Sequence, residues 1–140
     1  MKSSTPYSRF TTKYQVRPDD IDMFQHVHNS RYFDYVLAAR YDQMTQFYKM
    51  SMETFMEKGY GWVVHIAHVE YKRSLKMGDH FSVETGIETM HDRGCKVSFT
   101  IRESEKNKVV CTGWFDYVLI HLSTGRSAKI TEEMRTNYLI

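Results

Sequence analysis

The residues best suited to chemistry lie in one polar segment, from Arg17 to Tyr32. It offers a carboxylate pair, Asp20 and Asp22, and two histidines, His26 and His28, just before a predicted helix. A helix N-terminus presents unpaired amides and a partial positive charge, which suits a carbonyl whose oxygen becomes negative during reaction. A nearby carboxylate could attack that carbonyl or activate a water against it. The same residues also fit a structural acidic loop, since aspartate favours turns and complements the helix dipole.

A metal site is another functional interpretation of these residue types. The two carboxylates and two imidazoles supply plausible ligands, and His65 and His68 could add to them. However, seven histidines in 140 residues will often fall close together by accident, and the sequence has no Cys-x-x-Cys or His-Glu-x-x-His frame. We therefore treat a metal as the weaker alternative and predict no metal cofactor.

A long helix is predicted directly after the acidic loop, from about Ser30 to about Tyr48. Asn29 and Ser30 are good N-cap residues, because their side chains can accept hydrogen bonds from free helix amides. An apolar stripe recurs at helical spacing, formed by Tyr32, Val36, Ala39 and Phe47. The stripe predicts that this helix packs against a sheet.

Five strand-like segments accompany this helix. Residues 10–17 alternate apolar and polar side chains and are followed by Pro18, which lacks a ladder donor. A short helix within residues 50–61 is predicted to contact the core through Phe55 and Met56 and to end at Gly59. Four strands follow, at residues 63–73, 81–88, 95–102 and 109–122, and then a short helix from Thr131. We predict an α+β fold in which one antiparallel sheet, its last four strands in a meander, wraps around one long central helix.

Composition excludes several classes of protein. A chain of 140 residues with 41% hydrophobic and 26% charged residues predicts one globular domain over residues 1–140. The net charge of +2 gives no electrostatic basis for binding nucleic acid. No apolar run approaches the roughly 18 residues of a membrane helix, and residues 1–9 lack the apolar stretch of a secretory signal. We therefore expect a cytoplasmic protein without a membrane span.

The two cysteines, Cys95 and Cys111, are predicted to be buried and reduced. They fall on consecutive antiparallel strands joined by a turn near Lys106 and Asn107. With that turn as the centre, Cys95 faces the region of Val118 and not Cys111. A disulfide is therefore not expected.

These residues resemble the hotdog-fold acyl-CoA thioesterases, specifically the group around 4-hydroxybenzoyl-CoA thioesterase and the Tol–Pal-associated acyl-CoA thioesterases. The family pattern is an Asp-x-Asp, a Gly-His-Val-Asn-Asn-like turn, and a helix that starts with a tyrosine and ends near Ala-x-Arg. Here it reads Asp20-Ile21-Asp22, His26-Val27-His28-Asn29, Tyr32 and Ala38-Ala39-Arg40. Gln25 replaces the usual glycine, so the acyl substrate of the family cannot be transferred to this chain.

The resemblance implies a role for each matching residue. Asp22 matches the acidic residue that acts as nucleophile or general base. Asn29 stands near the helix start whose backbone amide polarises the thioester carbonyl, and His26 could orient water or substrate. Asp20 would brace the loop by accepting backbone hydrogen bonds, and Tyr32 would form core or substrate-pocket wall and would not act as a catalyst.

Coenzyme A would enter as part of the substrate, and no separate cofactor is implied. Arg93 falls at the hairpin where some relatives place a basic cluster against the coenzyme A phosphates. Its neighbours His91 and Asp92 depart from that pattern. Lys72 and Arg73, at another strand end, are substitutes for the phosphate contact, with solvated surface charge as the alternative reading.

The resemblance also implies self-association, because hotdog domains pair through sheet edges and build their sites between protomers. We therefore expect a homodimer or homotetramer with Asp22 facing the partner chain, and an exposed edge strand would benefit from such pairing.

The leading hypothesis is an enzyme that hydrolyses the thioester of an acyl-CoA or acyl carrier protein to free acid and thiol. The alternative is a non-catalytic acyl-CoA-binding module of the same fold, acting as a sensor or carrier. Asp22 argues against this alternative, since binding alone has no need for a carboxylate beside an anionic ligand. A dehydratase of the same fold is a third and weaker option.

Overall fold

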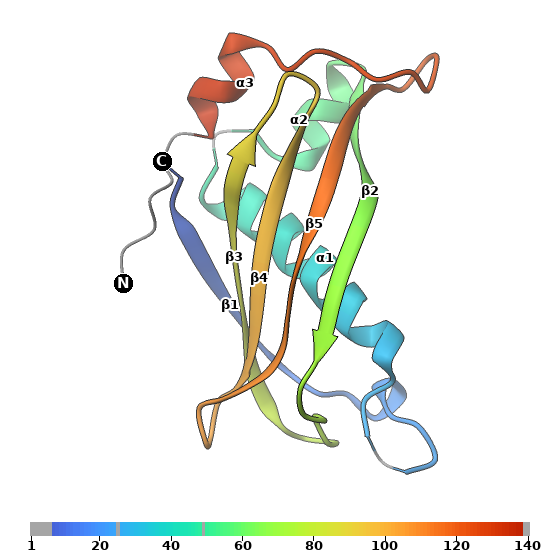
Figure 1. Ribbon diagram of the computed structural model, residues 1–140, viewed down its shortest axis with the longest axis vertical. Helices are drawn as coiled ribbons and strands as arrows, with labels where there is room; N and C mark the ends of the chain where they lie inside the picture. The colour runs from blue at the N-terminus through green and yellow to red at the C-terminus, as the bar shows by residue number, and fades with distance from the viewer. Residues whose placement is uncertain (1–6, 25, 49, 139–140) are drawn as a thin grey trace.

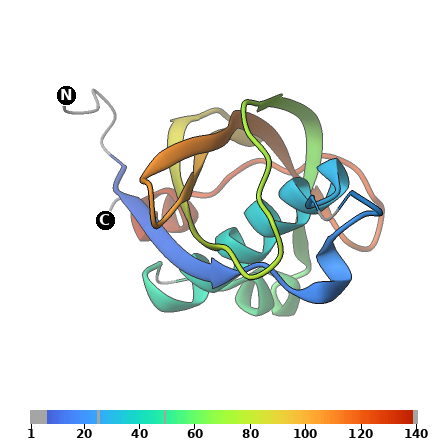
Figure 2. The ribbon, with the colours of Figure 1, turned by 90° about the horizontal axis from the view of Figure 1, so that it is seen from below.

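One antiparallel sheet and one long helix form the two main layers in a computed structural model, which describes residues 7–24, 26–48 and 50–138. The elements in chain order are β1 (Arg9–Gln15), a 3₁₀ turn (Pro18–Asp20), α1 (Asn29–Gln46), α2 (Met52–Glu57), β2 (Tyr60–Tyr71), β3 (His80–Met90), β4 (Gly94–Glu103), β5 (Lys108–His121) and α3 (Glu132–Asn137). The strands lie in the order β1-β3-β4-β5-β2 (Figure 1). Seen from the end, the sheet curves around α1, as the predicted α+β fold requires (Figure 2).

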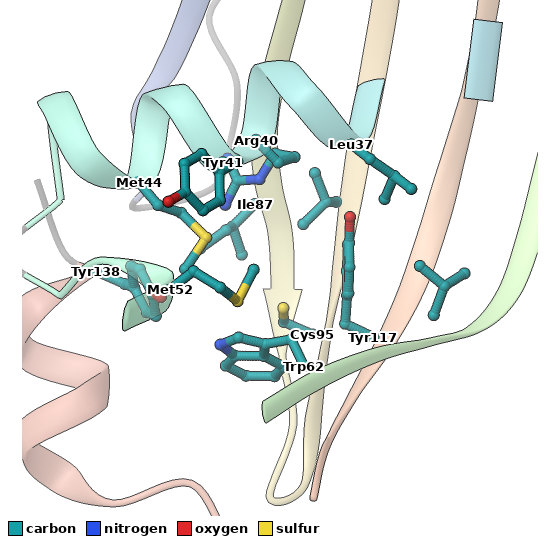
Figure 3. A pocket seen from close by; sticks show the side chains of 12 residues that line it. Leu37, Arg40, Tyr41, Met44, Met52, Trp62, Ile87, Cys95, Tyr117 and Tyr138 are labelled. Carbon is teal, nitrogen blue, oxygen red and sulfur yellow. The ribbon is translucent and has the colours of Figure 1, made fainter. Parts of the chain in front are cut away.

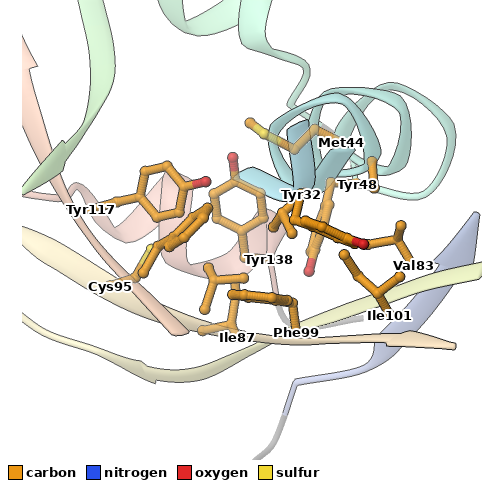
Figure 4. Close-up of a cluster of buried hydrophobic side chains, with 14 of the residues drawn as sticks. Tyr32, Met44, Tyr48, Val83, Ile87, Cys95, Phe99, Ile101, Tyr117 and Tyr138 are labelled. Atoms are coloured by element: carbon orange, nitrogen blue, oxygen red, sulfur yellow. The ribbon is translucent and has the colours of Figure 1, made fainter. Parts of the chain in front are cut away.

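The core lies between α1 and the inner face of the sheet (Figure 4). Tyr32, Val36 and Ala39 of the predicted stripe are all buried. Phe47 follows the end of α1 and is 43% exposed, so its assignment to the stripe is wrong. The buried surface of α1 continues instead through three residues whose spacing fits the same helical face, Arg40, Gln43 and Met44.

The predicted meander is correct only for β3, β4 and β5. β2 pairs with β5 at the far edge of the sheet, from Tyr60 opposite His121 to Tyr71 opposite Cys111. The predicted turn at residues 76–79 exists, with Gly78 at φ +84°, but it belongs to a segment that crosses from β2 to β3 without pairing them. Contacts with the loop after β1 hold this crossing in place, because Val16 donates to the Asp79 carbonyl and Val27 donates to the Leu75 carbonyl, both at 2.9 Å.

The two cysteines behave as predicted. Cys95 lies opposite Tyr117 and Cys111 lies opposite Ile101, and both thiols are free and buried. Burial raises the pKa of each thiol to about 12. Both side chains are therefore neutral members of the core at physiological pH.

The short helix α2 closes one end of the core. Phe55 is fully buried as predicted, whereas Met56 is 57% exposed and does not serve as a core contact. Gly59, at φ +86°, follows the helix and turns the chain into β2. In the described part of the chain, no helix has the length and apolar character needed to span a membrane.

The close approach of β2 and β5 at Gly113 gives a test of the fold. A Cβ at Gly113 would stand 1.9 Å from the His68 carbonyl oxygen and 2.8 Å from the Phe99 ring. We expect Gly113→Ala to push the two strands apart and to lower the free energy of unfolding by about 1–3 kcal/mol, measured by urea denaturation. The neighbouring Thr112→Ala should cost less than about 1 kcal/mol, and equal losses in the two variants would contradict the close approach.

Candidate active site

The loop before α1 is built around the buried carboxylate of Asp20, which is 6% exposed. Its Oδ2 accepts the backbone N–H of Arg17 at 3.0 Å and the Tyr35 hydroxyl at 2.8 Å. Its backbone carbonyl accepts the His28 N–H at 3.0 Å. Burial, aided by the Asp20 carboxylate, raises the pKa of Tyr35, so that its hydroxyl keeps the donated proton. Asp20 thus ties both ends of the loop to α1, and its predicted bracing role is confirmed.

Asp22 lies two residues further on and is only partly buried. Its Oδ1 accepts the backbone N–H groups of Phe24 at 2.9 Å and His26 at 3.2 Å. Desolvation acts to raise the pKa of this carboxyl, but the two N–H donors, together with His28 and His26, outweigh it and hold the pKa below its ordinary value. Among the described residues, no group donates to Oδ2. Asp22 is therefore an ionised carboxylate with one oxygen anchored and the other open.

The N-terminus of α1 follows directly. The helix begins at Asn29 with His28 in the N-cap position and no side-chain cap, so the prediction that Asn29 or Ser30 caps it is wrong. Tertiary contacts set the earlier start, since Asp20 holds the His28 N–H and the Tyr71 hydroxyl donates to the Asn29 carbonyl at 3.1 Å. The N–H groups of Asn29 and Ser30 find no acceptor in the described chain. They remain available to a ligand near Asp22.

His26 lies at the exposed end of the same loop, where its backbone bridges to Lys76. Its imidazole is close enough to Asp22 to contribute to the lowered pKa of that carboxyl. Within residues 7–24, 26–48 and 50–138, no three histidine, cysteine, aspartate or glutamate side chains converge as metal ligands. On β2, His68 instead stacks on Trp114. The described side chains thus give the metal alternative no geometric support.

Tyr32 lies in the core below this loop. Its hydroxyl accepts the Leu75 N–H at 2.9 Å, and its ring packs edge-on against Tyr35 and Tyr71. It therefore supports the crossing segment between β2 and β3. A direct contact between Tyr32 and substrate stays a prediction.

The three basic residues predicted to meet coenzyme A do not lie together. Lys72 and Arg73 follow β2 at the same end of the molecule as the Asp22 loop, where their N–H groups bond to the Val110 carbonyl. Arg93 lies at the other end, in the β3–β4 turn, and its guanidinium donates to the Ser127 carbonyl at 3.0 Å. Of these three residues, one protomer thus brings Lys72 and Arg73, but not Arg93, toward the Asp22 end.

A cavity of about 360 Å³ lies between the second half of α1 and the inner face of the sheet (Figure 3). Its apolar wall includes Leu37, Met44, Met52, Val64, Ile87 and Val97. Arg40 is the charged side chain on this wall, and Trp62, Tyr117 and Tyr138 add polar atoms. The volume is that of a small-molecule pocket.

Comparison with known proteins decides the family. A family model described as the thioesterase-like superfamily matches residues 16–137. The chain belongs to the thioesterase-like superfamily. It is a thioester hydrolase of the hotdog fold.

Individual relatives of this hydrolase are distant in sequence. The long-chain acyl-CoA thioesterase FadM of Escherichia coli is 23% identical over 124 residues, which are 89% of this chain and 92% of FadM. A 1,4-dihydroxy-2-naphthoyl-CoA thioesterase from Synechocystis superposes with a TM-score of 0.84 at 17% identity, covering 94% of this chain and 96% of that one. The protein SAV2348 from Staphylococcus aureus, solved in complex with CoA, gives 0.81 at 20% identity, covering 97% and 85%. The subgroup named from the sequence stays a prediction.

The sequence indicated the Asp20–Asp22 loop as the candidate site, but the cavity was not predicted. The burial of Arg40 could have been predicted, because its spacing places it on the same helical face as Val36 and Met44. Tyr71, which fixes the start of α1, and Trp62, which lines the cavity, carried no comparable signal. Gln25, where the sequence departs from the family pattern, lies outside the described residues.

The bracing role of Asp20 can be tested separately from catalysis. Asp20→Ala removes the buried carboxylate that accepts the Arg17 N–H and the Tyr35 hydroxyl, and a hydrogen bond to a charged group contributes about 1.5–3 kcal/mol. We expect a matching loss in the free energy of unfolding, measured by thermal or urea denaturation. Asp19→Ala is the control, because that carboxylate is exposed and, among the described residues, forms its ion pair with Arg17 alone. A loss in the control as large as in Asp20→Ala would contradict the bracing role.

Proposed function

We propose that this protein hydrolyses acyl-CoA thioesters, with Asp22 acting on the carbonyl that the first-turn amides of α1 polarise. The observation that carries the proposal is the placement of the open Oδ2 of Asp22 in the loop that leads into those amides. An aspartate carboxyl is ordinarily ionised at neutral pH, and the lowered pKa of Asp22 favours this state further. An anion to act on the carbonyl and donors for its oxygen are the two groups that acyl transfer requires.

In the general-base route, Asp22 Oδ2 takes a proton from water as the water oxygen attacks the carbonyl carbon. Negative charge moves to the carbonyl oxygen, where the N–H groups of Asn29 and Ser30 stabilise it. The carbon–sulfur bond then breaks, and the leaving thiolate recovers the proton. The products are a free carboxylic acid and the thiol of coenzyme A.

Asp22 could instead attack the carbonyl itself, giving an acyl anhydride that water then cleaves. The hydrogen bonds to Oδ1 bear on this choice. They make the carboxylate readily ionised but weaken it as a base, whereas the best general base has a pKa near the working pH. Both routes use the same residue, and both place its free oxygen toward the substrate.

Coenzyme A thioesters are the proposed substrate class. FadM is named for long-chain acyl-CoA, and the protein from S. aureus was solved with CoA bound. Both support coenzyme A as the group carried by the substrate. Lys72 and Arg73, at the Asp22 end, are the proposed contacts of its phosphates. A carrier-protein substrate and a cytoplasmic location stay predictions.

We further propose that two copies pair through β2. Both edge strands could pair in principle, but β1 is short, at seven residues, and carries Arg9 and Lys13. β2 has twelve residues with Glu70 as its single acid and no lysine or arginine. A long edge of low charge is prone to pair with another strand, whereas short and basic edges resist it.

Antiparallel pairing of two β2 strands would complete the site. It brings the Tyr71 end of one protomer, which holds the Asp22 loop, beside the Tyr60 end of its partner, which borders the partner's cavity. An acyl chain could then leave the carbonyl at Asp22 and enter the cavity of the second protomer. The Arg93 end of the partner would also approach the Asp22 loop. In that arrangement, Arg93 could contact the coenzyme A phosphates of a substrate bound there.

Asp22→Asn tests the mechanism. Its amide oxygen can still accept the Phe24 and His26 N–H groups, so the loop should stay folded, but the side chain can no longer serve as base or anionic nucleophile. We expect kcat to fall by about 10²-fold or more, measured as free thiol released from a panel of acyl-CoA substrates. Asp19→Asn, which changes an exposed carboxylate of the same loop, should keep its activity. Full activity in Asp22→Asn would overturn the mechanism, and saturable acyl-CoA binding without turnover in the wild type would favour the non-catalytic module.

Ile66→Lys tests the assembly. Ile66 is 43% exposed near the middle of β2, so a two-fold pairing would bring two lysines together, whereas the single chain offers Asp116 opposite this position. We expect sedimentation to show a dimer for the wild type and the 16.7 kDa monomer for the variant, with activity lost in the monomer. Thr11→Lys on β1 should remain dimeric. A wild type that is monomeric at assay concentrations would refute pairing through β2.

A further inference from the structure

The cavity beneath α1 contains a buried cation in an otherwise mostly apolar wall. Arg40 is 6% exposed and lines the cavity together with Leu37, Met44 and Ile87. Figure 3 shows its guanidinium among these side chains, with Trp62 and Tyr117 also facing the cavity. A charge in such surroundings is costly unless it meets an opposite charge or a full set of hydrogen bonds.

The protein supplies only part of that compensation. Nη1 of Arg40 donates to the Thr85 hydroxyl at 3.0 Å and to the Tyr48 hydroxyl at 3.4 Å. Thr85 in turn donates to the Gln43 side chain, so this side of the guanidinium is anchored. In the described part of the chain, Nε and Nη2 have no acceptor and no carboxylate forms an ion pair with Arg40. A guanidinium has five N–H donors in a planar fork, and most of them are left for a ligand.

Three titratable side chains near Arg40, those of Tyr117, Cys95 and Tyr138, do not provide a negative charge. Burial raises the pKa of Tyr117 to about 12, although Arg40 acts against this, and raises that of Cys95 to about 12 in the same way. Burial also raises the pKa of Tyr138, with Arg40 and the Trp62 N–H acting in the opposite direction. All three side chains are therefore neutral at physiological pH, and the guanidinium keeps its net charge.

Two more polar atoms of this cavity lack a well-formed hydrogen bond. Trp62 Nε1 and the Tyr138 hydroxyl are buried and lie near each other, and neither meets hydrogen-bond geometry with a described residue. Buried polar atoms without well-formed partners are rare in folded proteins and call for an explanation. Arg40, Trp62 and Tyr138 all carry N–H or O–H donors, so this part of the cavity suits a ligand that accepts hydrogen bonds.

We propose that the cavity binds a carboxylate through Arg40, and that the preferred acyl group carries a carboxylate at its far end. A carboxylate fits because its two oxygens match the planar N–H fork of a guanidinium. The statement about the acyl group rests on the proposed function, in which the chain enters the cavity from Asp22 of the partner. The apolar wall would hold the methylenes, and Arg40 would select the terminus.

Binding of octanoate and 1-octanol tests the carboxylate site without any turnover. We expect octanoate to raise the Tm of the wild type and 1-octanol of equal length to do so much less, since only octanoate offers an anion. Arg40→Met should lose this difference, because it keeps the apolar length and removes the charge. Arg40→Lys should keep part of it. Arg102→Met, at an exposed arginine on β4, should retain the difference and serves as the control.

Hydrolysis of matched thioesters tests the substrate class. At one chain length between six and twelve carbons, we expect kcat/KM for the ω-carboxyacyl-CoA to exceed that for the plain acyl-CoA by at least about tenfold. Arg40→Met should remove or reverse that preference while still hydrolysing the plain substrate. If this variant does not fold, the wild type alone decides, and a preference for plain chains at every length overturns the proposal.

The two proposals fail in different ways. Hydrolysis of plain acyl-CoA only, with equal effects of octanoate and 1-octanol on Tm, would overturn the carboxylate site and leave the thioesterase mechanism intact. Octanoate binding that depends on Arg40, without hydrolysis of any thioester, would overturn the mechanism and leave the carboxylate site standing.

Discussion

Burial of α1 against the inner face of the curved sheet is the constraint on which the other features depend. Because Tyr32, Val36 and Ala39 face the sheet, the axis and rotation of the helix are fixed, and both of its ends acquire a defined environment. Its first turn is held beside the Asp20 loop by Tyr35 and Tyr71. Its second half leaves a cavity over β2, β3, β4 and β5. One packing interface thus positions an anionic loop at one end of the helix and a cationic pocket toward the other.

Two aspartates in this loop, Asp20 and Asp22, have the same side chain but different surroundings, and this difference gives them different roles. Asp20 is buried, accepts hydrogen bonds from Arg17 and Tyr35, and pairs with Arg31. Its carboxylate therefore stabilises the conformation of the loop. Asp22 is partly exposed and uses one oxygen for backbone donors while the other faces away from them. In the proposed mechanism, the Asp20 brace holds Asp22 in place before the reaction, and such prior placement reduces the reorganisation required during it.

The edge strand β2 lies beside both the cavity and the start of α1, and it is also the strand proposed to pair with a second copy. It borders the cavity through Trp62 and Val64 and reaches the helix start through Tyr71. Its length and its lack of lysine and arginine leave an edge that a second copy could cover. Pairing at this edge would also explain how an anchored carboxylate and a distant pocket can belong to one site, because antiparallel symmetry brings opposite ends of two protomers together.

The sequence by itself determined the main elements and the position of the Asp-x-Asp loop before α1, because these follow from local patterns. Strand alternation and the stripe of Tyr32, Val36 and Ala39 depend on near neighbours in the chain, and the Asp-x-Asp segment is contiguous. Only the tertiary structure decided that β2 pairs with β5 and that Tyr71 and Asp20 set the start of α1. It alone brought Arg40 together with Trp62, Tyr117 and Tyr138. These outcomes depend on contacts between residues far apart in sequence, and the local order of residue types does not show which of those contacts will form.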